Sequence, residues 1–307
     1  MKVSLITTVL NEEENIKSLL KSVIQQKVKP DEFIIVDGGS KDNTLDILKS
    51  YSRKYKWIKI YLAKGASIGK GRNIAISKAK NNIIAVTDAG CVLDKGWLRE
   101  IVKPFEVKNV DVVVGIYKAN YVNDFEYFQG LVTVPKLEKI FGNPSRMSIR
   151  SMAFKKSMWE TLGGLPESYG GDDTKFNILI MEKKYKIIFS KNAIVYWKMR
   201  KNWKDFFKQY FKYGIGDWKY RNILKLKKNF LFVFILPILF VVYIYLIIQN
   251  GFWIILLPIA FISFGAYSVM ITRKIKSILF LPSLYFVKRI AYLSGAWYGI
   301  FREFVKR

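Results

Sequence analysis

The chain has 307 residues, 51% of them hydrophobic and 24% charged, and its 51 Lys and Arg against 24 Asp and Glu give a net charge of +27. This length accommodates one large domain or one domain with an appendage, and the mixture of apolar and charged residues indicates a soluble part joined to a membrane part. The single cysteine, Cys91, excludes a disulfide within the chain, and the absence of histidine excludes catalysis or metal binding by histidine.

The basic residues concentrate towards the end of the sequence. Between Lys198 and Arg307, 19 Lys and Arg stand against three acidic residues, a net charge of +16. Because these residues flank long apolar runs, we expect them to attract anionic lipid headgroups. Nucleic-acid phosphates would attract the same charges, but the neighbouring apolar runs favour a membrane as the partner and predict no nucleic acid.

Short β-rich runs alternate with amphipathic segments over the first 120 residues. Strands are predicted at Val3–Val9, Glu32–Asp37, Trp57–Leu62, Ile83–Asp88 and Val110–Tyr117, and helices at Glu13–Gln26, Thr44–Tyr55, Lys70–Lys80 and Trp97–Phe105. This order predicts an α/β fold with a mixed, mostly parallel sheet. Ligands of such sheets bind at the carboxyl ends of strands, which directs attention to the residues after Val9, to Asp37 and to Asp88.

The following region is less regular. Phe125–Leu137 is apolar and aromatic, and we expect a helix there that touches the membrane or an acceptor. A turn is expected at Gly163–Glu167, a helix at Asp172–Lys184 and a last strand at Lys186–Trp197. We therefore expect residues 1–220 to form one cytoplasmic catalytic domain and residues 221–307 a membrane region.

Two uncharged runs, Phe230–Ile248 and Phe252–Ile271, are each long enough to span a hydrocarbon core. The three residues between them predict an α-helical membrane hairpin. Basic residues flank the outer ends of this hairpin and are absent from its turn, namely Lys225, Lys227, Lys228, Arg273, Lys274 and Lys276. The positive-inside rule then predicts a multi-pass protein of the cell membrane with its front domain in the cytoplasm. Two buried core helices are the alternative.

The last apolar segment, Ile278–Phe304, has Lys288 and Arg289 in its middle. This pattern favours an amphipathic helix in the membrane interface, broken near Pro282. A third membrane span is the alternative interpretation.

Polar residues follow the first two predicted strands. Thr8, Asn11 and Glu12 end the first strand, where they could meet a nucleotide base and ribose. The alternative is a helix start with Asn11 as its N-cap. Asp37 ends the second strand, where its carboxylate can accept hydrogen bonds from a base, and the two glycines after it allow close approach of a ligand.

Together these two motifs resemble the opening of family 2 glycosyltransferases, in which a strand ends in Asn-Glu and the next in Val-Asp-Asp-Gly-Ser. Gly69–Asn73 resembles the family's segment in which a glycine is followed after a short interval by Arg-Asn, and the resemblance implies that Arg72 approaches the nucleotide. The segment Thr87–Cys91 stands where the family carries Asp-x-Asp. The resemblance thus implies a glycosyltransferase A fold and inverting transfer from a nucleotide-diphospho-sugar donor.

The Asp-x-Asp position departs from the family pattern. Asp88 is present, but Gly90 replaces the second aspartate. In the family a divalent ion bridges these carboxylates and the donor diphosphate, and neutralises the charge that develops on the leaving group. We therefore expect Mg²⁺ or Mn²⁺ at Asp88, in a site weakened by the missing carboxylate.

The pair Asp172 and Asp173 resembles the family's Glu-Asp marker, whose second carboxylate is the general base for the acceptor hydroxyl. This implies Asp173 as the base with Asp172 beside it; the alternative is that one of them only caps the following helix. The expected acceptor is a hydroxyl of a lipid-linked glycan or glycolipid. A polyprenyl or dolichyl phosphate is the second candidate, and an inactive nucleotide-sugar-binding scaffold the third.

Overall fold

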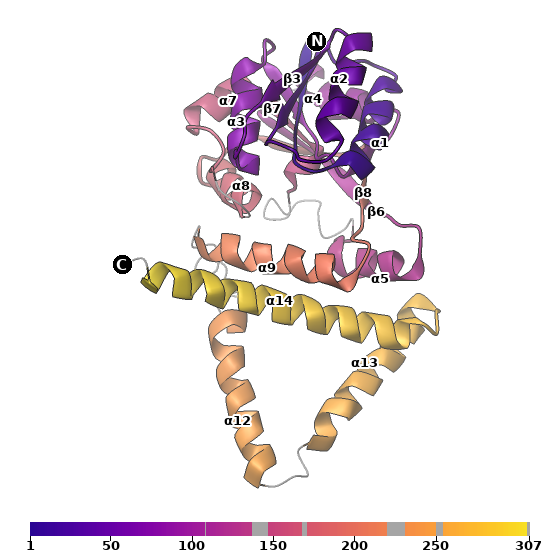
Figure 1. Ribbon diagram of the computed structural model, residues 1–307, viewed down its shortest axis with the longest axis vertical. Helices are drawn as coiled ribbons and strands as arrows, with labels where there is room; N and C mark the ends of the chain where they lie inside the picture. Colours follow the sequence, from indigo (N-terminus) through magenta and orange to yellow (C-terminus); the bar gives the residue numbers. More distant parts are fainter. Residues whose placement is uncertain (108, 137–146, 168–170, 220–230, 250–253, 306–307) are drawn as a thin grey trace. The chain divides into compact units, whose positions relative to one another are not determined.

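The computed structural model describes residues 1–107, 109–136, 147–167, 171–219, 231–249 and 254–305 (Figure 1). The chain divides into two compact units. The first unit comprises Met1–Asn120 and Val134–Lys198, and the second comprises Tyr121–Thr133 and Met199–Arg307. The functional boundary expected near residue 220 remains a prediction, since compactness alone does not test which residues serve catalysis.

The first unit is built on an eight-stranded sheet with the order β3-β2-β1-β4-β7-β6-β8-β5. The strands are β1 Val3–Val9, β2 Glu32–Asp37, β3 Ile58–Leu62, β4 Ile83–Val86, β5 Cys91–Leu93, β6 Val112–Asn120, β7 Met152–Lys155 and β8 Ile187–Lys198. Strands β3, β2, β1 and β4 are parallel, whereas β7 is antiparallel to β4 and β6, and β5 is antiparallel to β8. The α/β class is confirmed, and the sheet is mixed, with the parallel pairings concentrated in its first half.

Helices cover both faces of this sheet (Figure 1). They are α1 Glu13–Ile24, α2 Thr44–Lys54, α3 Ile68–Lys78, α4 Trp97–Val107, α7 Lys156–Thr161 and α8 Asp172–Glu182. Side chains of α3, α7 and α8, including Ile76, Met158 and Phe176, form one buried core with Ile6 and Val86 of the sheet. Leu5 precedes Ile6 and is equally buried, which places it on the opposite face because side chains alternate along a strand.

The strand directions collect several loops at one edge of the sheet. The parallel strands β1, β2 and β4 all end there, which brings the residues after Val9, Asp37 and Asp88 to the same edge. Strand β7 runs the other way and pairs Met152 with Val86, so the residues just before Met152 reach this edge as well.

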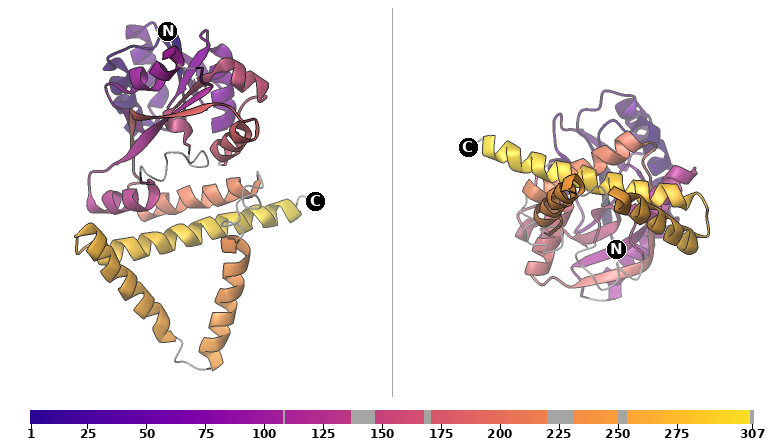
Figure 2. Two further views of the ribbon diagram at one scale, coloured as in Figure 1. Left: turned by 180° about the vertical axis from the view of Figure 1, so that it is seen from behind. Right: turned by 90° about the horizontal axis from the view of Figure 1, so that it is seen from below.

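The second unit is helical. Its elements are α5 Asp124–Thr133, α9 Trp203–Lys219, a π-helical turn Leu231–Ile235, α12 Leu236–Gln249, α13 Leu256–Thr272 and α14 Ser277–Val305. Phe128 of α5, Phe206 of α9 and Leu284 of α14 meet in its buried core. Helices α12 and α13 both extend from α14 on the side away from α9 (Figure 2).

Helices α9 and α14 run side by side in backbone contact (Figure 1). A Cβ on Gly295 would lie 2.0 Å from the carbonyl oxygen of Phe211, and one on Gly214 would lie 2.2 Å from that of Tyr292. Neither position has room for a methyl group without moving a helix.

Helix α14 runs without interruption from Ser277 to Val305, so the break expected near Pro282 is absent. Pro282 lies in the second turn, where its ring removes one backbone hydrogen bond, and packing stabilises the helix on both sides of it. Leu281 and Leu284, its close neighbours, are buried in the core of the unit.

The structure differs in detail from the predicted hairpin. The two apolar runs form helices of 14 and 17 residues, and residue 230, residues 250–253, Lys225, Lys227 and Lys228 lie outside the described residues. Within the described ranges, no individual helix has both the length and the apolarity needed to cross a bilayer; Leu256–Thr272 and Ser277–Val305 meet these criteria only as a pair, which is bent by 116°.

Candidate active site

Three carboxylates singled out from the sequence converge on the guanidinium group of Arg72. Arg72 Nη2 donates to Asp88 Oδ1 at 2.7 Å. Arg72 Nη1 donates to Asp172 Oδ2 at 3.0 Å and to Asp173 Oδ1 at 2.7 Å. The Arg72 side chain is 4% exposed, whereas those of Asp88 and Asp173 are 29% and 30% exposed, so the cluster has one buried and one open side.

Local sequence explains how these side chains reach each other. Arg72 lies on α3, and Gly71 before it lets this helix approach the end of β1, because a Cβ there would lie 2.7 Å from Thr8 Cγ2. Asp172 and Asp173 form the first turn of α8. Neither of them is its N-cap, which is Gly171 with φ of 72°, so the alternative of a capping role is wrong.

Burial and the mutual charges of the cluster shift the pKa values of Asp172 and Arg72. Burial, assisted by the neighbouring Asp173 carboxylate, raises the pKa of Asp172 to about 7. Burial would lower the pKa of Arg72, but the charges of Asp173, Asp88 and Asp172 outweigh it and raise that pKa above its usual value. Arg72 therefore stays charged, and Asp172 exchanges its proton near neutral pH.

This shift predicts a pH-dependent effect of Asp172→Asn on stability. Asp172 keeps its proton up to about pH 7 in the folded chain, whereas an unfolded Asp loses it near pH 4. The raised pKa therefore stabilises the wild type at low pH, and this contribution is lost as the pH rises through about 7. We expect the melting temperature of Asp172→Asn, relative to wild type, to increase from pH 5 to pH 8. A difference that is constant over this range would contradict the assignment.

Asp37 is fully buried at the end of β2. Its Oδ1 accepts hydrogen bonds from the backbone N–H groups of Gly39 and Ser40, both at 2.7 Å. Its Oδ2 is buried without a hydrogen-bond partner among the described residues. Buried acceptors are normally satisfied, and the predicted role of accepting a hydrogen bond from a nucleotide base requires this oxygen to become accessible.

The polar residues after β1 join the first two loops to each other. Asn11 Oδ1 accepts from the Lys41 N–H at 2.8 Å, and the Asn11 N–H donates to Ser40 Oγ at 2.9 Å. The Glu12 N–H donates to Thr44 Oγ1 at 2.8 Å. Glu12, and not Asn11, is the N-cap residue of α1, so the proposed capping role of Asn11 is wrong.

The structure adds a residue that the sequence did not single out. Arg150 Nε lies 3.8 Å from Asp88 Oδ2, on the other side of that carboxylate from Arg72. Its guanidinium stacks 3.7 Å from the ring centre of Trp197 and 4.9 Å from that of Tyr117. An isolated arginine ahead of a short strand carries no motif, and its aromatic partners come from β8 and β6, so only the fold reveals this group.

The described residues do not by themselves form a metal site. Asp88, the expected metal ligand, has one oxygen bonded to Arg72 and the other near Arg150. Gly90 supplies no side-chain ligand, and nowhere in the described ranges do three Cys, Asp or Glu side chains gather in an arrangement suited to a metal ion. No catalytic step is therefore assigned to a metal here.

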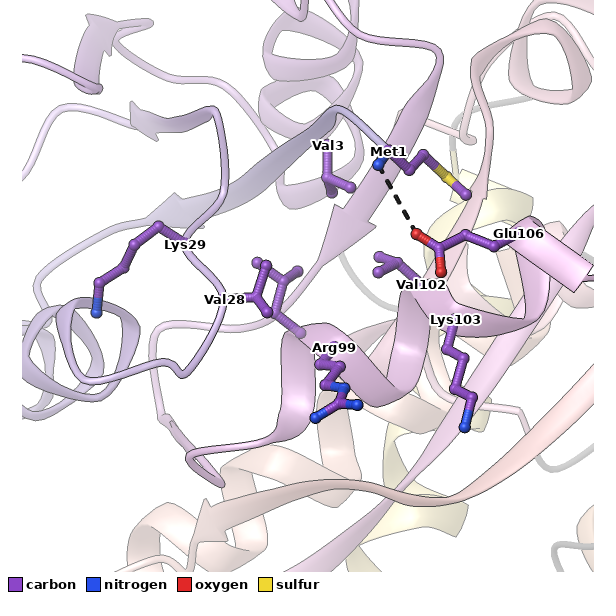
Figure 3. Close-up of a pocket in the computed structure, with 9 residues that line it drawn as sticks. Met1, Val3, Val28, Lys29, Arg99, Val102, Lys103 and Glu106 are labelled. Carbon is purple, nitrogen blue, oxygen red and sulfur yellow. Dashed lines mark ion pairs between the residues drawn. The ribbon is translucent and has the colours of Figure 1, made fainter.

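A pocket of about 260 Å³ lies beside the N-terminus and contains none of the predicted site residues (Figure 3). Val3 lies in its wall, at the start of β1 and therefore at the sheet edge opposite the cluster. The terminal amino group approaches Glu106 Oε1 at 3.7 Å. We assign this pocket no part in the chemistry.

Comparison with known families identifies the architecture. The sequence model described as "Glycosyl transferase family 2" matches residues 4–159, and "Glycosyl transferase family group 2" matches residues 83–293. The chain belongs to glycosyltransferase family 2. This membership confirms the expected family and enzyme class, and it agrees with the α/β sheet and with the loops gathered at its carboxyl edge.

Two relatives illustrate the range of the family. The cholesterol galactosyltransferase of Borreliella burgdorferi is 29% identical over 112 residues, which is 36% of this chain and 31% of that protein. The O-antigen chain rhamnosyltransferase RfbN of Salmonella typhimurium is 25% identical over 230 residues, 70% of this chain and 72% of that protein. The chain thus spans about a third of the first relative and about three quarters of the second.

Solved structures support the fold. Residues 1–349 of S. aureus TarS, in complex with UDP-GlcNAc, give a TM-score of 0.54 at 20% identity, covering 70% of this chain and 66% of that one. GalNAc-T7, solved with UDP, GalNAc and Mn²⁺, gives a TM-score of 0.53 at 17% identity, covering 65% of this chain and 44% of that one. At these identities the likeness establishes the glycosyltransferase A type of fold.

Proposed function

We propose that this glycosyltransferase transfers a sugar, with inversion, from a nucleotide-diphospho-sugar to a hydroxyl group of a lipid-linked glycan or glycolipid. The observation that carries the proposal is the cluster of Arg72 with Asp88, Asp172 and Asp173 at the carboxyl edge of the sheet. It combines an accessible carboxylate with a buried cation at the place where α/β sheets bind ligands.

The proposed reaction is a single displacement. The acceptor oxygen forms a bond to the anomeric carbon while the bond from that carbon to the diphosphate oxygen breaks, and the bonding electron pair leaves with the diphosphate. The proton of the acceptor hydroxyl passes to Asp173, whose side chain is 30% exposed and therefore within reach of an acceptor. Arg72 holds this carboxylate in place through a hydrogen bond of 2.7 Å.

The comparisons support the substrate classes. One similar structure contains UDP-GlcNAc, which supports a nucleotide-sugar donor. The names of two relatives mention cholesterol and the O-antigen chain, which supports a lipid or glycan acceptor.

A donor and acceptor screen tests the proposal. The full chain in detergent is incubated with UDP- and GDP-sugars and with membrane lipid extracts, and transfer of the labelled sugar to the lipid fraction is measured. We expect at least one donor to support transfer. Binding of a donor without transfer or hydrolysis would favour the inactive scaffold, and absence of donor binding would overturn the proposal.

We also propose that the second unit anchors the chain in the cell membrane, with the first unit on the cytoplasmic face. Many large apolar side chains of its helices are exposed, far beyond what a water-soluble surface carries. On α14 they form one stripe, comprising Leu279, Phe286, Ile290, Trp297, Phe301 and Phe304. Those of α12 and α13 include Ile238, Val241, Ile248, Leu257, Ile262 and Met270.

Protease accessibility in oriented membrane vesicles tests this topology. The hairpin interpretation with an interfacial α14 predicts that the first unit and the C-terminus are both cleaved from the cytoplasmic side. Protection of the C-terminus alone would make α14 a third span. Cleavage at the α12–α13 connection from the cytoplasmic side would contradict the hairpin.

A divalent metal, Mg²⁺ or Mn²⁺ at Asp88, remains a proposal for this chain, and Gly90→Asp tests it. A Cβ at Gly90 meets no atom within 4 Å, so the substitution should fold normally and add the absent carboxylate. Losing even an outer-shell partner costs about tenfold in metal affinity, and an added ligand should lower the Mn²⁺ concentration for half-maximal turnover by at least ~10-fold. Gly96→Asp is the control. An unchanged Mn²⁺ response would contradict a metal at this position.

A further inference from the structure

Arg150 lies beside Asp88, at the carboxyl edge of the sheet. It lies just ahead of β7, whose Met152 pairs with Val86 at the end of β4. This antiparallel pairing carries Arg150 past the end of β4, to the level of Asp88. The ion-pair distance of 3.8 Å from its Nε to Asp88 Oδ2 follows from that register.

Its side chain is fixed in place by aromatic rings. The guanidinium stacks 3.7 Å from the centre of Trp197 and 4.9 Å from that of Tyr117, and these two rings contact each other edge to face at 6.1 Å. Trp197 pairs with Cys91, next to Gly90, so the rings that hold Arg150 are themselves fixed to the Asp-x-Asp segment. A ring against the face of a guanidinium leaves the N–H donors, which lie in the guanidinium plane, directed to the edge of the group, where an anion can bind.

The charges in the cluster show why a second cation is needed. Arg72 is already bonded to three carboxylates, Asp88, Asp172 and Asp173. A diphosphate entering this edge would meet these negative charges, and it gains electrons as the sugar bond breaks. The Arg150 side chain is only 12% exposed, and its Nε donates to Ser148 Oγ at 2.8 Å. The contact of Nε with Asp88 is longer than a hydrogen bond, so we expect a phosphate oxygen to bind at the terminal Nη groups, in competition with the present partners of Arg150.

We propose that Arg150, held against the rings of Trp197 and Tyr117, binds the diphosphate of the donor and stabilises the charge that the leaving nucleoside diphosphate acquires. Arg150 accepts no proton and forms no covalent bond; the electron pair of the broken bond stays on the diphosphate oxygen, against which the guanidinium donates. The inference rests on the proposed function, because it names a contact for the diphosphate of that same donor. In this proposal, Arg150 neutralises part of the diphosphate charge. A metal ion held by a second carboxylate at the position of Gly90 would otherwise neutralise that part.

The test compares nucleotides that differ in the number of phosphates. Affinities of the full chain for UDP and UMP, and for GDP and GMP, are measured by calorimetry in the presence of EDTA. A hydrogen bond to a charged group contributes about 1.5–3 kcal/mol, which corresponds to roughly 10- to 100-fold in affinity. We expect Arg150→Gln to weaken binding of the nucleoside diphosphate of the preferred base by this factor, and binding of the corresponding monophosphate by less than about threefold. The diphosphate affinity of Arg150→Lys should lie between those of the wild type and of Arg150→Gln.

The matched control is Arg99→Gln, which removes the same charge from the exposed surface of α4 beside the N-terminal pocket of Figure 3. It should leave both affinities unchanged. If Arg150→Gln does not fold, Arg150→Lys carries the comparison, because it retains the charge and loses the planar stack. An unchanged ratio of diphosphate to monophosphate affinity in the folded Arg150 variants overturns the inference alone. Failure of the wild type to bind any of the four nucleotides overturns the inference together with the proposed function.

Discussion

Asp173→Asn should lower kcat by at least about 10²-fold, the lower bound of general-base assistance, and leave nucleotide affinity nearly unchanged. The attacking hydroxyl must lose its proton during the displacement, and the chain has no histidine to accept it. Asp173 has a partly exposed side chain and a hydrogen bond to Arg72 that fixes its orientation. Asparagine retains that hydrogen-bond acceptor and abolishes the base.

Steady-state transfer rates and calorimetric donor affinity, measured on the same preparations, check this result. Asp172→Asn is the paired variant; its side chain is 7% exposed, so direct contact with the acceptor is hindered and a smaller loss is expected. Asp205→Asn, on the exposed start of α9, is the control. Near-normal turnover of Asp173→Asn would remove the base assignment and favour a polyprenyl or dolichyl phosphate acceptor, since a phosphate is already ionised and needs no strong base.

Arg72→Met should destabilise the first unit by about 3–5 kcal/mol, the usual effect of removing one partner from a buried ion pair. Methionine fills much of the volume but leaves Asp172 buried and the other two carboxylates close together without their shared cation. These two carboxylates are partly exposed, so solvent screens their mutual repulsion, and the main cost comes from the buried Asp172. Turnover should be lost in the same variant, because Asp173 loses the group that orients it.

Thermal and urea unfolding, followed by tryptophan fluorescence, measure the loss of stability. The control is Arg53→Met on the exposed surface of α2, which should change stability by less than about 0.5 kcal/mol. An Arg72→Met variant as stable as Arg53→Met would show that the carboxylates do not depend on the guanidinium.

Periodicity and turn residues predicted most of the first unit. Strands β1 and β2 begin and end where expected, because apolar runs followed by Asn11 or Asp37 leave little choice of boundary. Strands β5 and β7 were missed, since three or four residues are too few to show alternation and their partners are distant in sequence. These two strands make the sheet mixed, and β7 brings Arg150 to the site.

The cluster of carboxylates was predictable from motifs, but the pattern of hydrogen bonds within it was not. Each of Arg72, Asp88 and Asp173 stands in a recognisable segment, so their proximity could be expected from the fold family. That one guanidinium binds all three carboxylates depends on the close approach of α3 to β1 and on the direction of α8, which no local pattern records. The continuity of α14 through Pro282 was likewise decided by packing rather than by local preference.

The contact of Gly214 and Gly295 makes α9 and α14 a single mechanical element. The main chains of these two helices touch at both glycines, and hydrogen bonds from Tyr292 to Asp217 and from Trp218 to Glu303 also join them, so one helix is not free to slide or roll against the other. A displacement of α14 at the end next to α13 therefore moves α9 and α14 together as a rigid body. The single methyl group introduced by Gly295→Ala would force the two helices apart and uncouple them, without changing the sequence of the carboxylate cluster.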